Sequence, residues 1–377
     1  MKILINGVGA YSVIHGVERY IYQLTKNLAQ IYPEDEFILV RAPWQMYYDG
    51  IADPGRPNLN IMTLAVPRNQ VARHTWHAVV FPCLAQHLAP DVVHLPNTLP
   101  LFISFRKVVS TIHDVYEFDV PEAFNTFSSM YRRLILRSQS RCSDRIITDS
   151  NYSRQRLAET LLIRDPKTVA IWLGPSWDHD NSFDYGLDSN TAWSLSFKAN
   201  YILFVGTITR HKNVCTLLQS FRILLDEGFS SHHLVIVGRP GNAWEEMWKT
   251  IYNLSLQDTV HYLADVNDKE LRSLYRHAKV FAMPSLMEGF GFPAVDAMSM
   301  GIPVITSDRG SLPEICGTAA CLVDPLDIRG IANALQLVIS DHSFRDALAQ
   351  RSLERSKLFS WEETAKKTHL VYENVTG

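Results

Sequence analysis

The sequence predicts an α/β protein with two doubly wound parallel-sheet domains. The chain has 377 residues, which suits two domains, since a domain usually holds about 100–200 residues. Short, uninterrupted apolar runs alternate with amphipathic stretches, and such runs are typical of parallel strands buried on both faces. The runs form two series separated by a segment without clear periodicity, so each series is expected to build its own sheet.

The first series predicts the N-terminal domain. Its expected strands are KILI (2–5), EFILV (36–40), DVVHL (91–95), KVVSTI (107–112), RIIT (145–148) and TVAIWL (168–173). Helical patterns occupy 17–30 and 153–162, and Ser150 is expected to cap the second of these helices. The chain start becomes polar too quickly for a signal peptide, so it predicts the first strand.

The second series predicts the C-terminal domain. Its expected strands are YILFVG (201–206), HLVIVG (233–238), TVHYL (259–263), KVFAMPS (279–285), IPVITS (302–307) and CLVD (321–324). The segment 174–199 between the two series is rich in Gly, Asp, Asn and Ser, which is typical of a linker. We therefore expect one domain over 1–175 and another over 176–357, with a helical pattern at 358–377.

The composition excludes several classes of protein. Hydrophobic residues make up 46% and charged residues 20%, which excludes a disordered chain, a collagen and a small disulfide scaffold. The net charge of −3 shows no basic excess, so nucleic acid is not an expected partner. No stretch approaches the roughly 20 apolar residues of a membrane span. The five cysteines form no Cys-x-x-Cys pair, which predicts reduced thiols, no structural zinc site and a cytoplasmic protein.

The most informative motif covers residues 284–314, PSLMEGFGFPAVDAMSMGIPVITSDRGSLPE. A loop with two glycines precedes a helix that is expected to start near Pro293 and to end at Gly301. Backbone N–H groups before a helix favour an anion, and carboxylates bind sugar hydroxyls well. We therefore expect Glu288 and Asp296 to face one pocket, although a plain strand-to-helix turn would share this pattern.

A second motif, VGTITRHKN (205–213), places three basic residues after a predicted strand. They are Arg210, His211 and Lys212, and the Arg and Lys among them would clamp a diphosphate and offset charge on a leaving group. No Gly-Lys-Ser/Thr sequence follows, so this is not a Walker loop. Basic loops of this kind are also commonly just exposed to solvent.

Two further motifs follow strands of the first series. Gly7, Gly9 and Gly16 surround the first strand-to-helix loop and permit close approach of a ligand to the backbone. A dinucleotide fingerprint would need Gly at the position of Ser12, which argues against an NAD dehydrogenase. His113 follows directly on a buried strand, at the end where doubly wound sheets bind ligands, although a single His is more often a packed residue.

Together these motifs resemble the retaining family 4 glycosyltransferases of the GT-B fold over nearly the whole chain. The most specific part is 201–325, with GTxxxxKN, VIVG, PSxxEGFGFPxxDAMxxGxPVITSxxGSLPE and VDP. The first half agrees through GVERY, TIHD and RIITDSNYSRQRL. The resemblance implies two Rossmann-like domains facing across a cleft, with the helix at 358–377 packing back on the N-terminal domain.

The resemblance also implies roles for individual residues. The catalytic positions would be His113, Lys212 and Glu288. The positions that bind the nucleotide-sugar donor would be Gly7, Gly9, Gly16, Arg210, His211, Gly289, Phe290, Gly291 and Asp296. Asp296 stands where the family has Glu and is one methylene shorter, and either Arg210 or His211 would supply a second phosphate contact. No metal and no cofactor are implied, since the nucleotide sugar is itself a substrate.

The implied function is a retaining transfer of a sugar in cell-surface polysaccharide synthesis. Similarity to bacterial mannosyltransferases favours GDP-mannose as the donor and a glycan or lipid-linked saccharide as the acceptor. One alternative is a nucleotide-sugar epimerase of similar fold that acts by hydrolysis and re-addition. Another is a non-catalytic subunit that binds nucleotide sugars.

A basic segment at 131–145 suggests contact with a membrane. Arginine recurs at every fourth position and would form one helical stripe, Arg133, Arg137, Arg141 and Arg145. Such a stripe suits the anionic inner face of a membrane, which would make the protein peripheral, although a solvated helix face would look the same. The amphipathic segment 70–88, with aromatic side chains expected to be exposed, would extend this surface.

Overall fold

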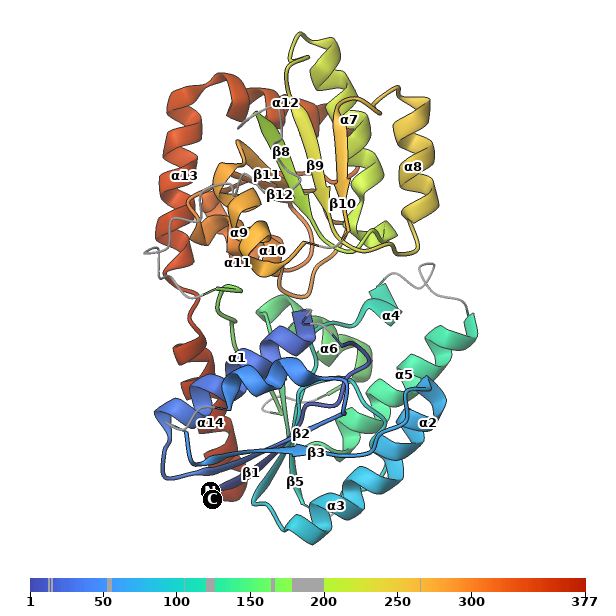
Figure 1. Ribbon diagram of the computed structural model, residues 1–377, viewed down its shortest axis with the longest axis vertical. Helices are drawn as coiled ribbons and strands as arrows, with labels where there is room; N and C mark the ends of the chain where they lie inside the picture. Colours follow the sequence, from blue (N-terminus) through green and yellow to red (C-terminus); the bar gives the residue numbers. More distant parts are fainter. Residues whose placement is uncertain are drawn as a thin grey trace. The chain divides into compact units, whose positions relative to one another are not determined.

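The computed structural model describes residues 1–12, 14, 16–52, 56–104, 106–119, 126–163, 167–177, 200–264 and 266–377. They divide into two compact units (Figure 1). Unit 1 comprises Met1–Gly174 and Ser360–Gly377, and unit 2 comprises Pro175–Phe359. Most of the expected linker, 178–199, lies outside the described residues.

Unit 1 contains a parallel sheet. Its described strands are β1 (Lys2–Asn6), β2 (Glu36–Arg41), β3 (Leu59–Thr63), β4 (Val92–Leu95), β5 (Lys107–Thr111), β6 (Arg145–Thr148) and β7 (Thr168–Ala170). They pair in parallel in the order β3-β2-β1-β4-β5-β6-β7. The edge strand β3 was not predicted, because LNIMT is not a continuous apolar run and is only partly buried.

Helices cover this sheet and join its parallel strands. They are α1 (Gly16–Ile31), η1 (Met46–Ile51), α2 (Gln70–Thr75), η2 (Trp76–Val80), α3 (Phe81–Leu88), α4 (Tyr116–Asp119), α5 (Thr126–Cys142), α6 (Asn151–Leu161) and α14 (Trp361–Thr376). As predicted, Ser150 caps α6, because its Oγ accepts the backbone N–H of Ser153 at 3.1 Å.

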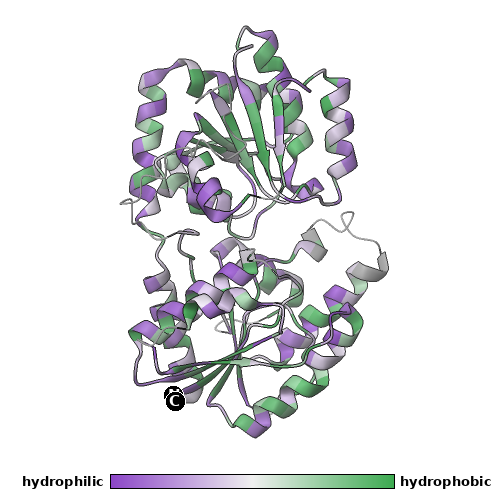
Figure 2. Cartoon of the chain, viewed as in Figure 1, coloured by the Kyte–Doolittle hydropathy of each residue, from purple (hydrophilic) through white to green (hydrophobic). Residues whose placement is uncertain are grey.

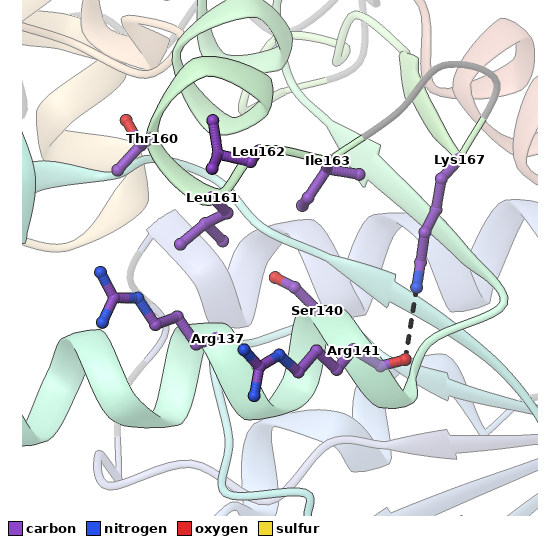
Figure 3. Close-up of a pocket in the computed structure, with 8 residues that line it drawn as sticks. All are labelled: Arg137, Ser140, Arg141, Thr160, Leu161, Leu162, Ile163 and Lys167. Carbon is purple, nitrogen blue, oxygen red and sulfur yellow. Dashed lines mark hydrogen bonds between the residues drawn. The ribbon is translucent and has the colours of Figure 1, made fainter.

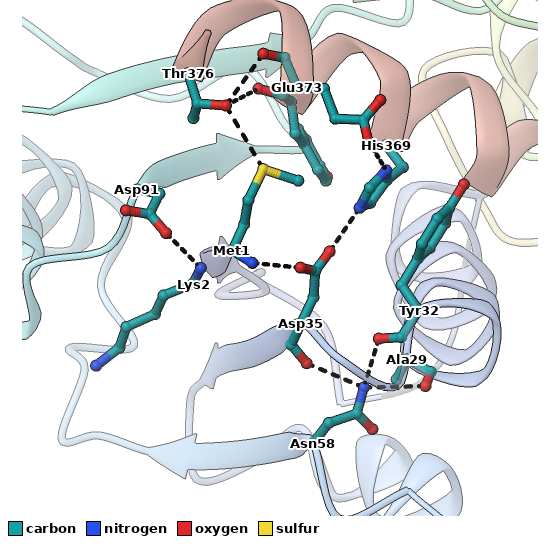
Figure 4. Close-up of polar contacts among 11 residues, drawn as sticks. Met1, Lys2, Ala29, Tyr32, Asp35, Asn58, Asp91, His369, Glu373 and Thr376 are labelled. Atoms are coloured by element: carbon teal, nitrogen blue, oxygen red, sulfur yellow. Dashed lines mark hydrogen bonds and ion pairs between the residues drawn. The ribbon is translucent and has the colours of Figure 1, made fainter.

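The C-terminal helix α14 is an integral part of unit 1. It lies against α1, as Figure 1 shows. On α14, His369 Nε2 lies 2.5 Å from Asp35 Oδ2, and the Tyr32 ring stacks on His369 with centroids 3.5 Å apart (Figure 4). Tyr372, one turn along, bonds to buried His94 of β4 at 2.6 Å. These buried polar contacts fix the position of α14 on the sheet.

Two expectations about the surface of unit 1 are wrong. In the segment 70–88, Trp76 and Phe81 are 7% and 2% exposed and belong to the core, so its aromatic side chains are not a surface. Helix α5 ends at Cys142 and Arg145 begins β6, so Arg145 cannot continue a helical stripe. The first error arises because helical spacing alone does not reveal which side of a helix meets the core, and the second because spacing does not reveal where a helix ends.

Unit 2 contains the second parallel sheet. Its described strands are β8 (Tyr201–Val205), β9 (His233–Val237), β10 (Val260–Leu263), β11 (Val280–Met283), β12 (Val304–Ser307) and β13 (Ala320–Val323). Their order is β10-β9-β8-β11-β12-β13. Figure 2 shows that the strands of both sheets are predominantly hydrophobic, whereas the helices combine hydrophobic and hydrophilic residues. This agrees with the continuous apolar runs that predicted them.

The helices of unit 2 connect its strands in the same way. They are η4 (Arg210–Lys212), α7 (Val214–Asp226), α8 (Trp244–Asn253), α9 (Asp268–His277), α10 (Phe292–Ser299), α11 (Leu312–Cys316), η5 (Gly317–Ala319), α12 (Ile328–Ser340) and α13 (His342–Ser356). The predicted fold class, two doubly wound parallel-sheet domains, is therefore confirmed.

Each sheet reverses its strand order at one point. The reversal lies between β1 and β4 in unit 1 and between β8 and β11 in unit 2. At such a point the two following loops leave in opposite directions, and a ligand site forms beyond the carboxyl ends of the strands. A ligand site is therefore expected at the loops that follow β8 and β11, or at those that follow β1, β4 and β5.

Candidate functional site

In unit 2, the loops that follow β8 and β11 are tied together. The loop after β8 leads into η4, and the backbone N–H of Leu286 donates to the carbonyl of His211 at 2.7 Å. The Asn213 side chain donates to the carbonyl oxygens of Pro284 and Pro325 at 3.0 and 2.7 Å. These bonds fix the distance between the basic loop, residues 210–212, and the acidic loop, residues 284–291.

The central contact of the site joins Lys212 and Glu288. Lys212 Nζ lies 2.5 Å from Glu288 Oε1, and the two side chains are only 13% and 7% exposed. Taking two charges out of water is expensive, and their attraction offsets this only in good geometry. The structure therefore brings together the two unit 2 residues that the sequence assigned to catalysis. A phosphate arriving here would meet an ammonium already held in place.

Glu288 is positioned by a residue to which the sequence assigned no role. Gly310 has φ of +67°, and a Cβ at this position would lie 2.9 Å from the backbone N of Glu288. The next residue, Ser311, donates its backbone N–H to the carbonyl of Glu288 at 3.2 Å. The loop after β12 thus packs against the acidic loop. Only glycine fits at position 310, because a Cβ there would clash with the backbone of Glu288. The signal in the sequence was a glycine following a predicted strand.

The other two residues of the basic loop, His211 and Arg210, differ from Lys212 in charge or in exposure to solvent. Burial, partly opposed by the Glu288 carboxylate and assisted by the Lys212 ammonium, lowers the pKa of His211 to about 4. His211 is therefore neutral at neutral pH. The Arg210 side chain is 60% exposed, with Nε 3.7 Å from Glu246 Oε2. Of the three predicted basic residues, one is a buried cation, one is uncharged and one is an exposed cation.

The glycine-rich loop before α10 combines backbone freedom with core packing. Gly291 has φ of +96°, and a Cβ there would lie 2.7 Å from Leu312 Cδ2. The Phe290 side chain is 3% exposed and packs on Phe292 and Phe359, with centroids 5.4 and 5.8 Å apart. Phe290 therefore offers a ligand its backbone and not its ring. Gly289 lies beside it in the same loop.

The Asp296 carboxylate is hydrogen-bonded to Ser176. Its Oδ1 accepts the backbone N–H of Ser176 at 2.6 Å, and its Oδ2 accepts the Ser176 hydroxyl at 2.7 Å. The carboxylate is 5% exposed. Both oxygens of this buried carboxylate are therefore engaged by hydrogen bonds from Ser176. Ser176 lies in none of the motifs recognised in the sequence, so this contact was not predicted.

In unit 1, His113 is held between two acceptors. Its Nδ1 lies 2.7 Å from Asp149 Oδ2 and its Nε2 lies 3.0 Å from the carbonyl oxygen of Pro96. Both nitrogens bond best when both carry a proton. Burial alone would lower the pKa of His113, but the Asp149 carboxylate outweighs it and raises the pKa above its usual value. The Tyr20 ring meets the imidazole edge-on at 5.0 Å. Asp149 and Tyr20 were not predicted as partners.

The glycines of the first loop have packing roles in this structure. A Cβ on Gly7 would lie 2.8 Å from Leu39 Cδ1, and one on Gly9 would lie 2.8 Å from Glu18 Oε1. A Cβ on Gly16, the first residue of α1, would meet open space. Close packing against Leu39 of β2 therefore accounts for Gly7, and close packing against Glu18 of α1 accounts for Gly9, without a ligand.

The described residues contain neither a cluster of potential metal ligands nor a helix suited to span a membrane. No group of three or more His, Cys, Asp or Glu side chains is arranged to hold a metal ion among them. None of the described helices is both long enough and apolar enough to traverse a bilayer.

Known proteins match both halves of the chain. A family model described as Glycosyltransferase Family 4 matches residues 14–174, and one described as Glycosyl transferases group 1 matches residues 191–355. O-antigen chain mannosyltransferase B of Escherichia coli is 31% identical over 287 residues, which cover 75% of this chain and 74% of that protein. O-antigen chain mannosyltransferase RfbU of Salmonella typhimurium is 28% identical over 266 residues, 69% of each.

Solved structures agree on the fold. The crystal structure of Anabaena HepE in complex with UDP and glucose matches with a TM-score of 0.76. The match covers 99% of this chain and 100% of that one at 17% sequence identity. The two proteins therefore share this two-domain fold over nearly the full length of both chains.

Proposed function

Because the chain belongs to the family 4 glycosyltransferases, we propose that it transfers mannose from GDP-mannose to a glycan or lipid-linked saccharide, with retention of configuration and without a metal ion. The two bacterial relatives described above are O-antigen mannosyltransferases, which supports mannose as the sugar and cell-surface polysaccharide synthesis as the setting. The observation that carries the proposal is the buried Lys212–Glu288 pair at the strand reversal of unit 2.

In the proposed reaction, the bond between the sugar anomeric carbon and the diphosphate oxygen breaks as the acceptor oxygen attacks the same face. The departing diphosphate takes the acceptor proton. Negative charge grows on the diphosphate, and a preorganised cation stabilises that charge most effectively where water is excluded. We assign this role to Lys212. We assign the second cation to Arg210 and not to His211, because burial keeps His211 uncharged.

The remaining contacts follow from the same assignment. Glu288 would accept hydrogen bonds from hydroxyls of the transferred sugar, with Gly289, Phe290 and Gly291 contributing backbone N–H groups. Asp296, which also accepts two hydrogen bonds from Ser176, would bind the ribose hydroxyls. His113 keeps the role that family resemblance implies, near the reacting centre. These roles rest on the resemblance together with the contacts described above.

The donor is tested by thermal shift with GDP-mannose, UDP-glucose, a dTDP-sugar and an ADP-sugar. A ligand at 100 times its Kd stabilises the folded state by about 2.7 kcal/mol, so the true donor should give the largest rise in Tm. We expect GDP-mannose to do so. A larger rise with another nucleotide sugar would reject the donor but not the reaction class.

The reaction class is tested by product analysis with the preferred donor and lipid-linked saccharide acceptors. Formation of an α-linked product from the α-linked donor is expected. Conversion of the donor to an epimer without acceptor would favour the epimerase alternative. Donor binding with neither transfer nor hydrolysis would favour a non-catalytic binding subunit.

A further inference from the structure

Unit 1 contains a pocket outside the site described above. It has a volume of about 560 Å³. Figure 3 shows that side chains of α5 form one wall, the end of α6 forms the opposite wall, and Lys167 reaches in from the start of β7. Its lining residues are Arg137, Ser140, Arg141, Thr160, Leu161, Leu162, Ile163 and Lys167. The pocket thus has a cationic side and an apolar side.

Among the described residues that line the pocket, three are basic. Arg137, Arg141 and Lys167 line the pocket, and none of the described lining residues is acidic. Lys167 Nζ donates to the carbonyl of Arg141 at 3.3 Å, a neutral acceptor. Burial lowers the pKa of Lys167, and the Asp144 carboxylate partly opposes this shift. An anion in the pocket would supply the missing charge.

A purely structural explanation for the three cations is that they neutralise helix ends. Both α5 and α6 end at the pocket, and a helix C-terminus carries about half a negative charge. Two such ends amount to about one negative charge, whereas the pocket holds three positive ones. Arg137 also lies outside the last turn of α5, which ends at Cys142. Among the described lining residues, positive charge therefore exceeds the negative charge of the two helix ends.

Leu162 is the second unusual feature. It ends α6 with φ of +54°, and its side chain is 86% exposed. The left-handed conformation is unfavourable for leucine, and glycine or asparagine is the usual choice at such a helix end. An exposed apolar side chain in a strained conformation contributes little to the stability of the free protein. It would gain burial if an apolar group entered the pocket beside Leu161 and Ile163.

We propose that this pocket binds a phosphate group carried by an apolar tail, with Arg137, Arg141 and Lys167 holding the phosphate and the leucine pair 161–162 contacting the tail. Arginines four positions apart on one helix face present neighbouring guanidinium forks, which suit phosphate oxygens. The pocket is distinct from the His113 site, because α6 begins beside Asp149 and spans 11 residues before it reaches Leu162. At 1.5 Å per residue that is about 16 Å.

Calorimetric titration with dihexanoyl phosphatidic acid below its micelle concentration tests the proposal. We expect saturable binding to one site. R137Q/R141Q should weaken it about tenfold or more, since two charge-assisted contacts are lost. R132Q/R133Q removes the same charge from α5 at positions outside the pocket and should change the affinity less than about twofold. Glycerol 3-phosphate, which lacks the tail, should bind at least about tenfold more weakly.

The variant L162G separates binding from stability. It relieves the left-handed strain, so its Tm should not fall, yet its affinity for the lipid should drop several-fold. K212A/E288Q should bind the lipid like the wild type, which keeps this test independent of the proposed transfer reaction. Absence of saturable binding, equal losses in the two arginine double variants, or equal affinity for glycerol 3-phosphate would overturn the proposal. Vesicles with and without phosphatidic acid then show whether the lipid is met in a bilayer.

Discussion

Lys212 and Glu288 stand 76 positions apart in the chain, yet Lys212 Nζ and Glu288 Oε1 are 2.5 Å apart. Neighbouring parallel strands bring them together: Ile202 of β8 pairs with Val280 of β11, and Leu203 pairs with Phe281. Both loops leave this strand pair at its carboxyl end, so the register of the sheet sets the distance between the two charges. The Lys212–Glu288 pair is therefore a product of the sheet topology.

Replacing Lys212 by alanine should abolish most transfer activity. Removing a preorganised donor to developing negative charge typically lowers kcat about 10²–10³-fold. The single variant also leaves Glu288 buried without its partner, which should lower Tm. The double variant K212A/E288Q removes both charges and should recover much of the Tm but none of the activity. Transfer assays and thermal melts check the two effects separately.

The control for this experiment is Arg222→Ala. It breaks another ion pair in unit 2, Arg222–Asp226 on α7, whose side chains are 30% and 65% exposed. Exposed pairs of this kind contribute about 0–1 kcal/mol, so activity and Tm should remain close to those of the wild type. Full activity in K212A/E288Q would contradict the proposed role of the pair.

Replacing Gly310 by alanine should impair the site more than the fold. Gly301 provides a matched control, because it has the same φ of +67° but open space around its missing Cβ. G310A and G301A share the left-handed strain of about 1–2 kcal/mol, and only G310A pushes against the backbone N of Glu288. We expect a larger loss of Tm in G310A than in G301A, and a much lower kcat/KM in G310A alone. Equal kcat/KM values would mean that Gly310 does not position Glu288.

His113 should titrate at higher pH than an ordinary histidine, and Asp149→Asn should lower its pKa. Since the folded-state pKa is raised, the pair contributes stability in full below about pH 6.5. This contribution is lost as the pH rises through the raised pKa. The difference in unfolding free energy between wild type and D149N should therefore shrink at alkaline pH.

NMR titration of the imidazole protons measures this directly. His94 is an internal reference, because burial first of all, and then the charge of His113, lower its pKa to about 3. Its resonance should stay constant between about pH 5 and 9 while that of His113 moves. A His113 pKa at or below 6.5 in the wild type would refute the assignment of a protonated imidazole.

Tyr372→Phe should weaken the attachment of α14 to unit 1. The Tyr372 hydroxyl bonds at 2.6 Å to Nδ1 of His94, which is fully buried. Leaving such a group without a partner costs about 1–3 kcal/mol. Leu370→Ala on the same helix is the control, because Leu370 is 55% exposed and should change stability by less than about 0.5 kcal/mol. Urea unfolding measures both, and equal midpoints would show that the hydrogen bond is unimportant.

The success of the sequence-based predictions depended on how local their physical cause is. Runs such as YILFV (201–205) are apolar throughout because both faces of the strand are covered, so the strand can be recognised without its neighbours. The edge strand β3 was missed because it is only partly buried. The helical spacing at 131–145 was correct as far as Cys142, but the start of β6 at Arg145 depends on pairing with β5.

The candidate site was predicted as a set of residue types and not as a set of contacts. The motif containing Glu288 and Asp296 suggested two carboxylates facing one pocket. In the structure, Glu288 meets Lys212, whereas Asp296 meets Ser176, 120 positions earlier in the chain. The basic loop at 210–212 looked uniform, but burial makes His211 neutral while Arg210 remains exposed. Spacing along the chain contains no information about such differences.

The sequence by itself determined two parallel sheets, the loops that follow their strands, and a family of enzymes, because apolar runs and glycine-rich turns are encoded locally. Only the tertiary structure decided which side chains share a hydrogen bond, which cations are buried and which histidine holds a second proton. These properties depend on desolvation and on short distances between segments far apart in the chain. A charge such as that of Lys212 acquires its chemical role only when folding excludes water from it and places Glu288 beside it.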